Sequence, residues 1–258
     1  MAMKSSTFSW YDLMTPDTAA AAKFYKAVFG WTTKDVTAGG TSYATFSTDK
    51  FNIGGMMPLT DDARKQGTPP YWNGYVLVDN VDDYAERIKK AGGKVLQPPV
   101  DVPGILRFAV VADPQGAVFI IFKGMQAPMA EEPQADTLGN VGWHELHAGD
   151  GETAFDFYEK LFAWKKTRAL DMGELGSYQL FTQDTGADSG GMMTKMKDVP
   201  APFWMFYFNV DSIDAAVERV NKAGGKVAMG PHQVPTGQWI ANCMDPQGAW
   251  FSMLSKTK

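Results

Sequence analysis

The sequence predicts an α+β fold made of four βαβββ modules, two in each half of the chain. The first observation is an internal repeat: AGGKV at 91–95 returns at 223–227, and DPQGA at 113–117 returns at 245–249, both 132 residues later. The second is the order of strand and helix patterns, which runs strand, helix and three strands twice within each half. Further matches at nearly the same spacing are Trp10 with Trp143, FY at 24–25 with 157–158, Trp72 with Trp204, and GGMM at 54–57 with 190–193. Features present in both halves serve the fold, whereas chemistry can depend on a feature present in only one.

Each half opens with a short strand, at residues 8–14 and 141–147, and continues into a helix whose ends are marked in the sequence. We expect Thr15 to cap the first helix, Pro16 to occupy its first helical position, and Gly30 to end it in a left-handed conformation. The corresponding helix of the second half is expected to begin near Glu152. Both helices carry an apolar stripe for the core, formed by Ala21, Phe24, Tyr25 and Val28 and by Phe155, Tyr158, Leu161 and Phe162.

Three further strands are expected after each of these helices, at 31–36, 43–47 and 53–59 and at 164–170, 177–182 and 190–196. Loops at 60–70 and 197–202 lead to a second round of the same order. In the first half this round comprises a strand at 72–78, a helix capped by Asp82, and strands at 94–97, 106–112 and 118–122. The second half matches from Trp204 through Asp214 onward. Residues 124–137 carry charge and proline and predict a solvated linker, so we expect domains at 1–123 and 138–258.

The totals restrict the classes of protein that the chain can belong to. At 258 residues with 45% hydrophobic residues, it is long enough to bury two cores. A net charge of −5 with scattered basic residues argues against a nucleic-acid partner. No apolar run approaches the roughly 20 residues that span a bilayer, and no signal peptide is visible, so we expect a cytoplasmic protein without a membrane partner. The single cysteine, Cys243, has apolar neighbours and is expected to be buried and inert.

Several of these features together resemble one family. They are the module order, the Phe-Tyr pair in the first helix, the Ala-Gly-Gly end of the second helix and the Asp-Pro-Gln-Gly turn before the last strand. This set resembles the vicinal oxygen chelate superfamily, which holds glyoxalase I, bleomycin-resistance proteins and extradiol dioxygenases, and it covers residues 8–122 and 141–254. The resemblance implies that two modules pair so that their mixed β-sheet curves into a cup with flanking helices. It also implies that active members hold a divalent metal there through His and Glu ligands.

At the places where the family carries its metal ligands, this sequence has other residues in both halves. The first-strand places hold Trp10 and Trp143, the fifth-strand places Asn73 and Met205, and the final-strand places Ile120 and Ser252. Indole, thioether and aliphatic groups do not supply the nitrogen and carboxylate donors that a divalent ion requires. We therefore expect no metal at the usual site, while a divalent metal at an unfamiliar place stays open.

The candidate site consists of polar and aromatic side chains on the strand faces that carry Trp10 and Trp143. Asp12 comes two residues after Trp10, and Glu145 comes two residues after Trp143. Because side chains alternate along a strand, the two members of each pair share one face. Only the second half adds a histidine, His147. The candidate catalytic residues are Glu145 and His147, and the candidate ligand-binding residues are Trp10, Asp12, Trp72, Asn73, Trp143 and Trp204. The alternative is structural, in which the carboxylate accepts hydrogen bonds from its neighbours, His147 lies at the rim, and the tryptophans pack.

Three functions are compatible with these observations. The first is a glyoxalase/bleomycin-resistance-like protein that binds a small, partly apolar molecule and either sequesters it or modifies it by metal-independent acid–base chemistry. The second is a metal-dependent lyase, lactoylglutathione-lyase-like, or a dioxygenase with a non-standard site. The third is a protein-interaction module whose cups are filled by their own side chains. Whether the protein is an enzyme stays open, as do a monomer and a homodimer. Arg107 is expected either to bind an acidic ligand group or to form a salt bridge at the rim.

Overall fold

A computed structural model of the chain describes residues 6–38, 41–125, 133–183 and 186–258. The first half contains β1 (Phe8–Thr15), α1 (Thr18–Phe29), β2 (Thr32–Ala38), β3 (Thr41–Ser47), β4 (Asn52–Pro58), α2 (Asp61–Lys65), β5 (Tyr71–Leu77), α3 (Val81–Lys90), β6 (Lys94–Val102), β7 (Leu106–Ala112) and β8 (Val118–Gly124). The second half contains β9 (Val141–Ala148), α4 (Gly151–Phe162), β10 (Lys165–Asp171), the short 3₁₀ helix η1 (Gly173–Leu175), β11 (Ser177–Thr182), β12 (Gly190–Thr194), β13 (Phe203–Asn209), α5 (Ile213–Lys222), β14 (Lys226–Gln233), β15 (Trp239–Met244) and β16 (Trp250–Ser255).

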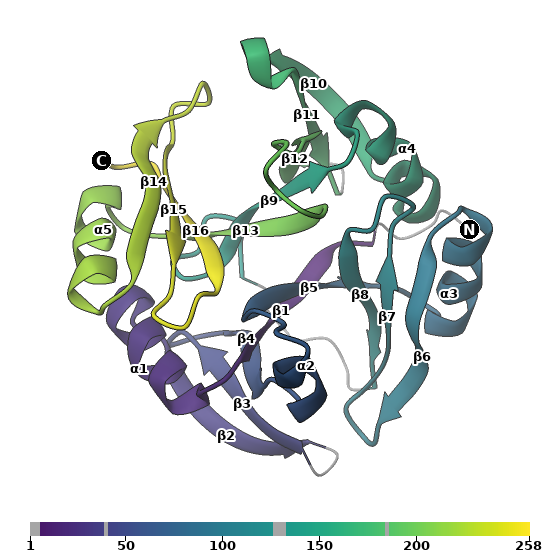
Figure 1. Cartoon of the computed structure of the whole chain (residues 1–258), viewed down its shortest axis with the longest axis horizontal. Coiled ribbons are helices and arrows are strands. Elements are labelled where there is room, and N and C mark those ends of the chain that lie inside the picture. The colour runs from purple at the N-terminus through teal and green to yellow at the C-terminus, as the bar shows by residue number, and fades with distance from the viewer. Residues whose placement is uncertain (1–5, 39–40, 126–132, 184–185) are drawn as a thin grey trace. The chain divides into compact units, whose positions relative to one another are not determined.

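These strands form two eight-stranded mixed sheets with the same topology (Figure 1). The strand order is β2-β3-β4-β1-β5-β8-β7-β6 in the first sheet and β10-β11-β12-β9-β13-β16-β15-β14 in the second. In both sheets the first strand of a module pairs in parallel with its fourth strand, as β1 does with β4 and β13 with β16. The remaining pairs within a module are antiparallel. The predicted α+β fold of paired βαβββ modules is confirmed.

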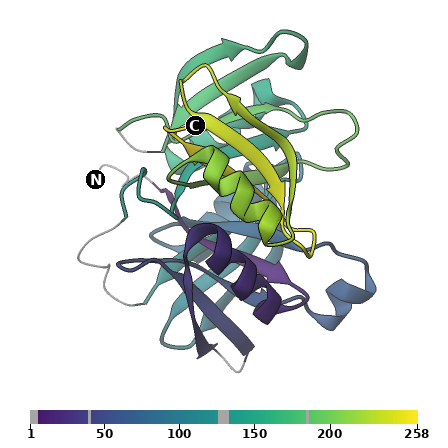
Figure 2. The same ribbon diagram turned by 90° about the vertical axis from the view of Figure 1, so that its left-hand side faces the viewer.

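By its internal contacts the chain divides into two compact units, each of which combines a module from the first half with a module from the second. Unit 1 comprises Met1–Trp10, Gly74–Met129 and His144–Met205, and unit 2 comprises Tyr11–Asn73, Ala130–Trp143 and Phe206–Lys258. Within unit 2, α1 and α5 lie side by side (Figures 1 and 2). Within unit 1, α3 and α4 are in contact. Among the described residues, no helix combines the length and apolar character needed to span a bilayer.

Two of the expected helix caps are wrong by two residues. The side chain of Asp17, not Thr15, caps α1 by accepting from the N–H of Ala20, because Thr15 still belongs to β1. The side chain of Asn80, not Asp82, caps α3. The predicted left-handed end of α1 at Gly30 is confirmed, with φ at 75°. Within the loop expected at 60–70, the short helix α2 forms.

In unit 2, the Asp-Pro-Gln-Gly turn of the second half binds the first helix of the first half. One carboxylate oxygen of Asp245 accepts from the backbone N–H of Gln247, and the other accepts from the Tyr25 hydroxyl at 3.1 Å. The Tyr25 oxygen in turn accepts from Trp72 Nε1 at 3.1 Å. The side chain of Gln247 pairs with the backbone N–H and C=O of Asp17, both at 2.8 Å. A turn far along the chain therefore satisfies the polar groups at the start and on the buried side of α1.

Unit 1 contains the reciprocal arrangement. The Tyr158 hydroxyl of α4 donates to Asp113 at 3.0 Å and accepts from Trp204 Nε1 at 3.2 Å. The Gln115 side chain accepts from the Asp150 N–H at 2.6 Å and donates to the Asp150 carbonyl at 3.0 Å. The repeated turn and the repeated Phe-Tyr pair are thus two sides of one contact, made once in each unit.

Candidate functional site

Strand β9 presents Trp143, Glu145 and His147 on one face, because successive side chains of a strand alternate. This face and its counterpart on β1, with Trp10 and Asp12, are called the site face. The intervening residue His144 lies on the opposite side, where it is buried and stacks on Phe8 with ring centroids 4.9 Å apart. Its Nδ1 lies 2.9 Å from the Ser189 carbonyl. His144 therefore faces away from Glu145 and His147.

Glu145 is the centre of a polar cluster in unit 1. The Tyr178 hydroxyl donates to Glu145 Oε2 at 2.7 Å, and His147 Nε2 lies 2.8 Å from Glu145 Oε1. The side chains of Glu145 and His147 are only 12% and 16% exposed. The His147 ring is stacked on Phe203, with centroids 4.6 Å apart and planes 1° from parallel. A carboxylate, an imidazole and a phenol are therefore held in contact within a largely desolvated environment.

The contact between His147 and Glu145 has the distance of an ion pair but not the geometry of a hydrogen bond. Although the two atoms are 2.8 Å apart, His147 Nε2 is buried and makes no well-directed hydrogen bond within the described residues. The stacking on Phe203 sets the plane of the imidazole ring. Nε2 thus retains hydrogen-bonding capacity beside the carboxylate.

Gly191 creates the space in which Tyr178 reaches Glu145. Gly191 lies opposite Glu145 in the pairing of β12 with β9, and a Cβ atom at this position would overlap the Tyr178 ring. The phenol of Tyr178, from β11, therefore crosses over the backbone of β12 to the next strand. Neighbouring Gly190 has a different constraint, since its Cβ would overlap the backbone carbonyl oxygen of His144.

The first half repeats the tyrosine and the carboxylate but not the histidine. In unit 2, the Tyr43 hydroxyl donates to Asp12 Oδ1 at 2.7 Å, and a Cβ on Gly55 would overlap the Tyr43 ring. At the position equivalent to His147 the first half has Met14. The two site faces therefore share a carboxylate–phenol pair, and the second half alone adds an imidazole to it.

Asp12 is buried and accepts from Tyr43, and the other predicted ligand-binding residues fall into two groups. Trp10, Asn73 and Trp143 are half-buried. Trp72 and Trp204 are 7% and 6% exposed, lie among core rings, and donate to tyrosine hydroxyls. This burial favours the packing alternative for Trp72 and Trp204, and ligand contact by the first group stays a prediction.

Tyr43, Tyr178 and Phe203 were not among the residues selected from the sequence. The two tyrosines stand at nearly matching places in the repeat. Tyr43 precedes the second glycine of the first GGMM sequence by 12 residues, and Tyr178 precedes the second glycine of the other by 13. This similarity in the sequence could have identified the two tyrosines. The stacking of Phe203 on His147 could not be predicted, because the two residues belong to different strands.

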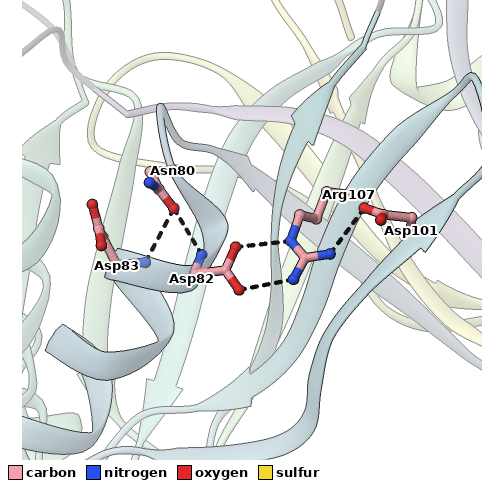
Figure 3. A network of polar contacts seen from close by, with 5 residues as sticks. All are labelled: Asn80, Asp82, Asp83, Asp101 and Arg107. Carbon is pink, nitrogen blue, oxygen red and sulfur yellow. Dashed lines mark hydrogen bonds and ion pairs between the residues drawn. The ribbon is translucent and has the colours of Figure 1, made fainter.

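Arg107, the residue expected to bind either an acidic ligand or a protein carboxylate, binds two carboxylates of the protein (Figure 3). Its Nε and one terminal nitrogen bind both oxygens of Asp82 at 2.8 Å, and its other terminal nitrogen binds Asp101 at 2.9 Å. Asp82 stands in the first turn of α3, which Asn80 caps, so the guanidinium joins α3 to strands β6 and β7. Of the two alternatives expected for Arg107, the structure therefore shows the salt bridge to protein carboxylates.

The sheet topology and the duplicated modules define the class of protein. The chain belongs to the Glyoxalase/Bleomycin resistance protein/Dioxygenase superfamily, whose family model matches residues 7–121 and 140–253. It is 31% identical over 256 residues to CFP32 of Mycobacterium tuberculosis, which is proposed to be a glyoxylase, covering 97% of this chain and 95% of the relative. It is 32% identical over 262 residues to the anthracycline biosynthesis protein DnrV of Streptomyces peucetius, covering 95% and 92%.

Solved structures share the fold at low sequence identity. The Mn(II)-bound glyoxalase of Novosphingobium aromaticivorans superposes with a TM-score of 0.66 at 15% identity, over 99% of this chain and 83% of the other. The 2,2',3-trihydroxybiphenyl 1,2-dioxygenase of Sphingomonas wittichii superposes with a TM-score of 0.68 at 13% identity, over 98% and 91%. These likenesses concern the fold alone.

The residues at the family's metal-ligand places do not suit a divalent ion. Trp10, Trp143, Met205 and Ile120 offer no hard or borderline donor, and Ser252 and Asn73 offer only neutral oxygens. In the described part of the chain, no group of three or more His, Cys, Asp or Glu side chains is placed to hold a metal ion. The donor set therefore differs from the one that the family's metal chemistry uses.

Proposed function

We propose that this protein binds a small, partly apolar molecule on its site faces and that Glu145 and His147 act on it by acid–base chemistry without the family's metal. The observation that carries the proposal is the cluster of Glu145, His147 and Tyr178, in which two titratable groups lie 2.8 Å apart at low exposure. A positioned carboxylate and imidazole are the common pair for moving a proton to or from a bound molecule.

The roles within the cluster follow from its contacts. Tyr178 donates to Glu145 Oε2 and so orients the carboxylate, whose other oxygen, Oε1, lies beside His147 Nε2 at the place proposed for proton exchange with the ligand. Phe203 fixes the imidazole plane, so His147 can accept or return that proton from a constant position. The half-buried Trp143 on the same strand provides apolar surface for a ligand.

The first half is proposed to bind without catalysing. Asp12 and Tyr43 form the same carboxylate–phenol pair, but the position of His147 is taken by Met14, which cannot exchange a proton. Trp10 and Asn73 are its proposed ligand contacts. This difference makes Asp12 a matched control for Glu145 within one protein.

The relatives support small-molecule chemistry of this kind. CFP32 is proposed to be a glyoxylase and DnrV is described as an anthracycline biosynthesis protein, and both match nearly the whole chain. Both descriptions concern small organic molecules, which agrees with a site walled by aromatic residues. An anthracycline is accordingly the first probe to test.

The proposal is tested by comparing Glu145→Gln with Asp12→Asn in buffer containing EDTA. Binding of an anthracycline is measured by calorimetry, and proton transfer is measured by mass spectrometry as enzyme-dependent exchange of solvent deuterium into the probe. Because the amide of the substituted side chain cannot take up a proton, we expect exchange in Glu145→Gln to fall about 100-fold, the usual size of a general-base effect, while thermal stability changes little. Asp12→Asn is expected to lower exchange less than about threefold.

Other outcomes would favour the remaining functions. Exchange that EDTA abolishes and added zinc or manganese restores would favour the metal-dependent lyase or dioxygenase. A decrease in deuterium exchange in Asp12→Asn as large as the decrease in Glu145→Gln would contradict a special role for the second half. Equal losses of stability and exchange in Glu145→Gln would assign the carboxylate a structural role.

Gly191→Ala is expected to separate the orientation of Glu145 from the stability of the fold. The new methyl group overlaps only the tip of the Tyr178 ring, which can swing away at the cost of its hydrogen bond to Glu145. We expect a loss of about 1 kcal/mol in unfolding free energy and an exchange rate about tenfold lower. Gly190→Ala is the control, because its methyl group overlaps the His144 carbonyl oxygen and the backbone must shift, costing about 3 kcal/mol. A fully active Gly191→Ala variant would contradict the role of Tyr178.

A further inference from the structure

A buried polar pair stands on the adjacent strands β15 and β16, within unit 2. Asn242 and Ser252 are directly opposite each other in the antiparallel pairing, and the Ser252 hydroxyl donates to Asn242 Oδ1 at 3.2 Å. Asn242 is 8% exposed and Ser252 is fully buried. Their neighbours along the strands, Cys243 and Phe251, lie on the core side, where Phe251 contacts the rings of α1. The polar pair is therefore on the face away from that core.

The next pair along the same face is apolar and reaches solvent. Trp250 is opposite Met244, and its side chain is 44% exposed although it is a large aromatic. Since Trp250 and Ser252 are two residues apart on one strand, the indole and the hydroxyl lie on the same face. The surface thus passes from an exposed aromatic group to a buried pair of hydrogen-bonding groups, the usual make-up of a small-molecule site.

The internal repeat demonstrates that the fold does not need polar residues here. The same cross-strand pair in the first half, 132 residues earlier, is Val110 with Ile120, and it is wholly apolar. Identical strand pairing is therefore achieved without a hydroxyl or an amide. A buried amide is costly to fold unless its groups are satisfied, so its presence in one copy alone calls for another explanation.

The Asn242 side chain has unused donors. Its only side-chain hydrogen bond within the described residues is the one that its oxygen accepts from Ser252, so the two N–H groups of its amide remain available. The amide nitrogen is not completely buried, so solvent reaches it. A ligand oxygen that reached this amide would find hydrogen-bond donors.

We propose that Asn242, supported by Ser252 and flanked by Trp250, binds the carbonyl oxygen of a planar aromatic ligand. The amide N–H donates to the carbonyl oxygen, Ser252 orients the amide through its oxygen, and the indole packs against the ring. Ser252 occupies a place where the family has a metal ligand, so neutral hydrogen-bond donors take the position of the ion that would otherwise bind a ligand oxygen. The assignment rests on the proposed small-molecule function and specifies the class of ligand.

The test compares two probes that differ only in their carbonyl groups. Anthraquinone-2-sulfonate and anthracene-2-sulfonate are titrated by calorimetry into the full-length protein and into the variant Asn242→Val/Ser252→Ile, which carries the pair that the first half uses. We expect the unaltered protein to prefer the quinone at least tenfold and the double variant to show a preference below twofold. The affinity of the double variant for the anthracene is expected to stay within twofold, and its melting temperature to be unchanged or higher, as the apolar pair predicts.

Two further variants keep the test decisive. Ser252→Ala removes one hydroxyl with little risk to folding and is expected to lower the preference about threefold. Trp250→Ala is expected to weaken both probes equally, about fivefold, because the indole contacts the ring and not the carbonyl. Val110→Ala in the first half is the control and should leave the preference unchanged.

Each contrary result has one meaning. A double variant that keeps the tenfold preference overturns the role of Asn242 and Ser252. An unaltered protein that binds both probes equally, or neither, overturns the assignment of a carbonyl ligand to this face. The proposed acid–base function is decided separately, because solvent exchange in Glu145→Gln does not depend on these two sulfonates.

Discussion

Asp113→Ala is expected to destabilise the protein by about 3 to 5 kcal/mol. The carboxylate accepts hydrogen bonds from the N–H groups of Gln115, Gly116 and Ala117 and from the Tyr158 hydroxyl, and alanine leaves all four donors without this acceptor. Buried donors that lose a partner cost about 1 to 3 kcal/mol each, and water at the turn satisfies part of that loss. Chemical denaturation followed by tryptophan fluorescence measures the change.

Asp245→Ala provides the matched comparison in unit 2, where the same carboxylate accepts from its own turn and from Tyr25. Because Asp113 and Asp245 share no partner, their effects are expected to add in the double variant. A loss below about 1 kcal/mol for either single variant would show that the carboxylate contributes little beyond what water supplies. Burial raises the pKa of both carboxyl groups, so their charged forms are held only through these hydrogen bonds.

His144→Gln is expected to remove a large part of the protein's loss of stability in acid. Burial lowers the pKa of His144 to about 4 from the ordinary 6.5. The unfolded chain therefore binds a proton between these values while the folded protein does not, and stability falls as the pH drops from 6.5 towards 4. At about 1.4 kcal/mol per pH unit, the loss is about 3 kcal/mol, and it should be missing in the variant.

The comparison is made on unfolding free energies of the unaltered protein and His144→Gln from about pH 4 to pH 8. Asp113 and Asp245 have raised pKa values, so their contribution to stability runs in the opposite direction, present in acid and lost as the pH rises. The difference between the two proteins cancels that background. His232→Gln, at an exposed histidine of β14, is the control for the exchange of histidine for glutamine. Parallel curves for the unaltered protein and His144→Gln would contradict a neutral, buried imidazole.

The repeat and the periodicity of the sequence were sufficient to predict the βαβββ modules and their order. The helix caps were less predictable, because several residues near a helix start can act as a cap and long-range pairing chooses among them. Thr15 is held in β1 by its pairing with Pro58, which leaves Asp17 to cap α1. Asp82 binds Arg107, and Asn80 caps α3.

Part of the candidate site was predictable in the same way. Alternation along β9 places Glu145 and His147 on one face, and the structure has them in contact at 2.8 Å. Neither Tyr178 nor Phe203 follows from that local pattern. Tyr178 reaches Glu145 only because Gly191 lies between them in the pairing of three strands, and Phe203 contacts His147 from another strand.

The sequence by itself therefore determined the strands, helices and turns of this protein, because side-chain periodicity and turn chemistry depend on neighbours a few positions away. The resemblance to the family also indicated the places where other residues replace the metal ligands. The contacts that join the two halves, such as Tyr25 with Asp245, and the cluster around Glu145 came from the folded structure. Such contacts depend on the register of strands far apart in sequence, and that register is set by the packing of whole sheets and helices at once.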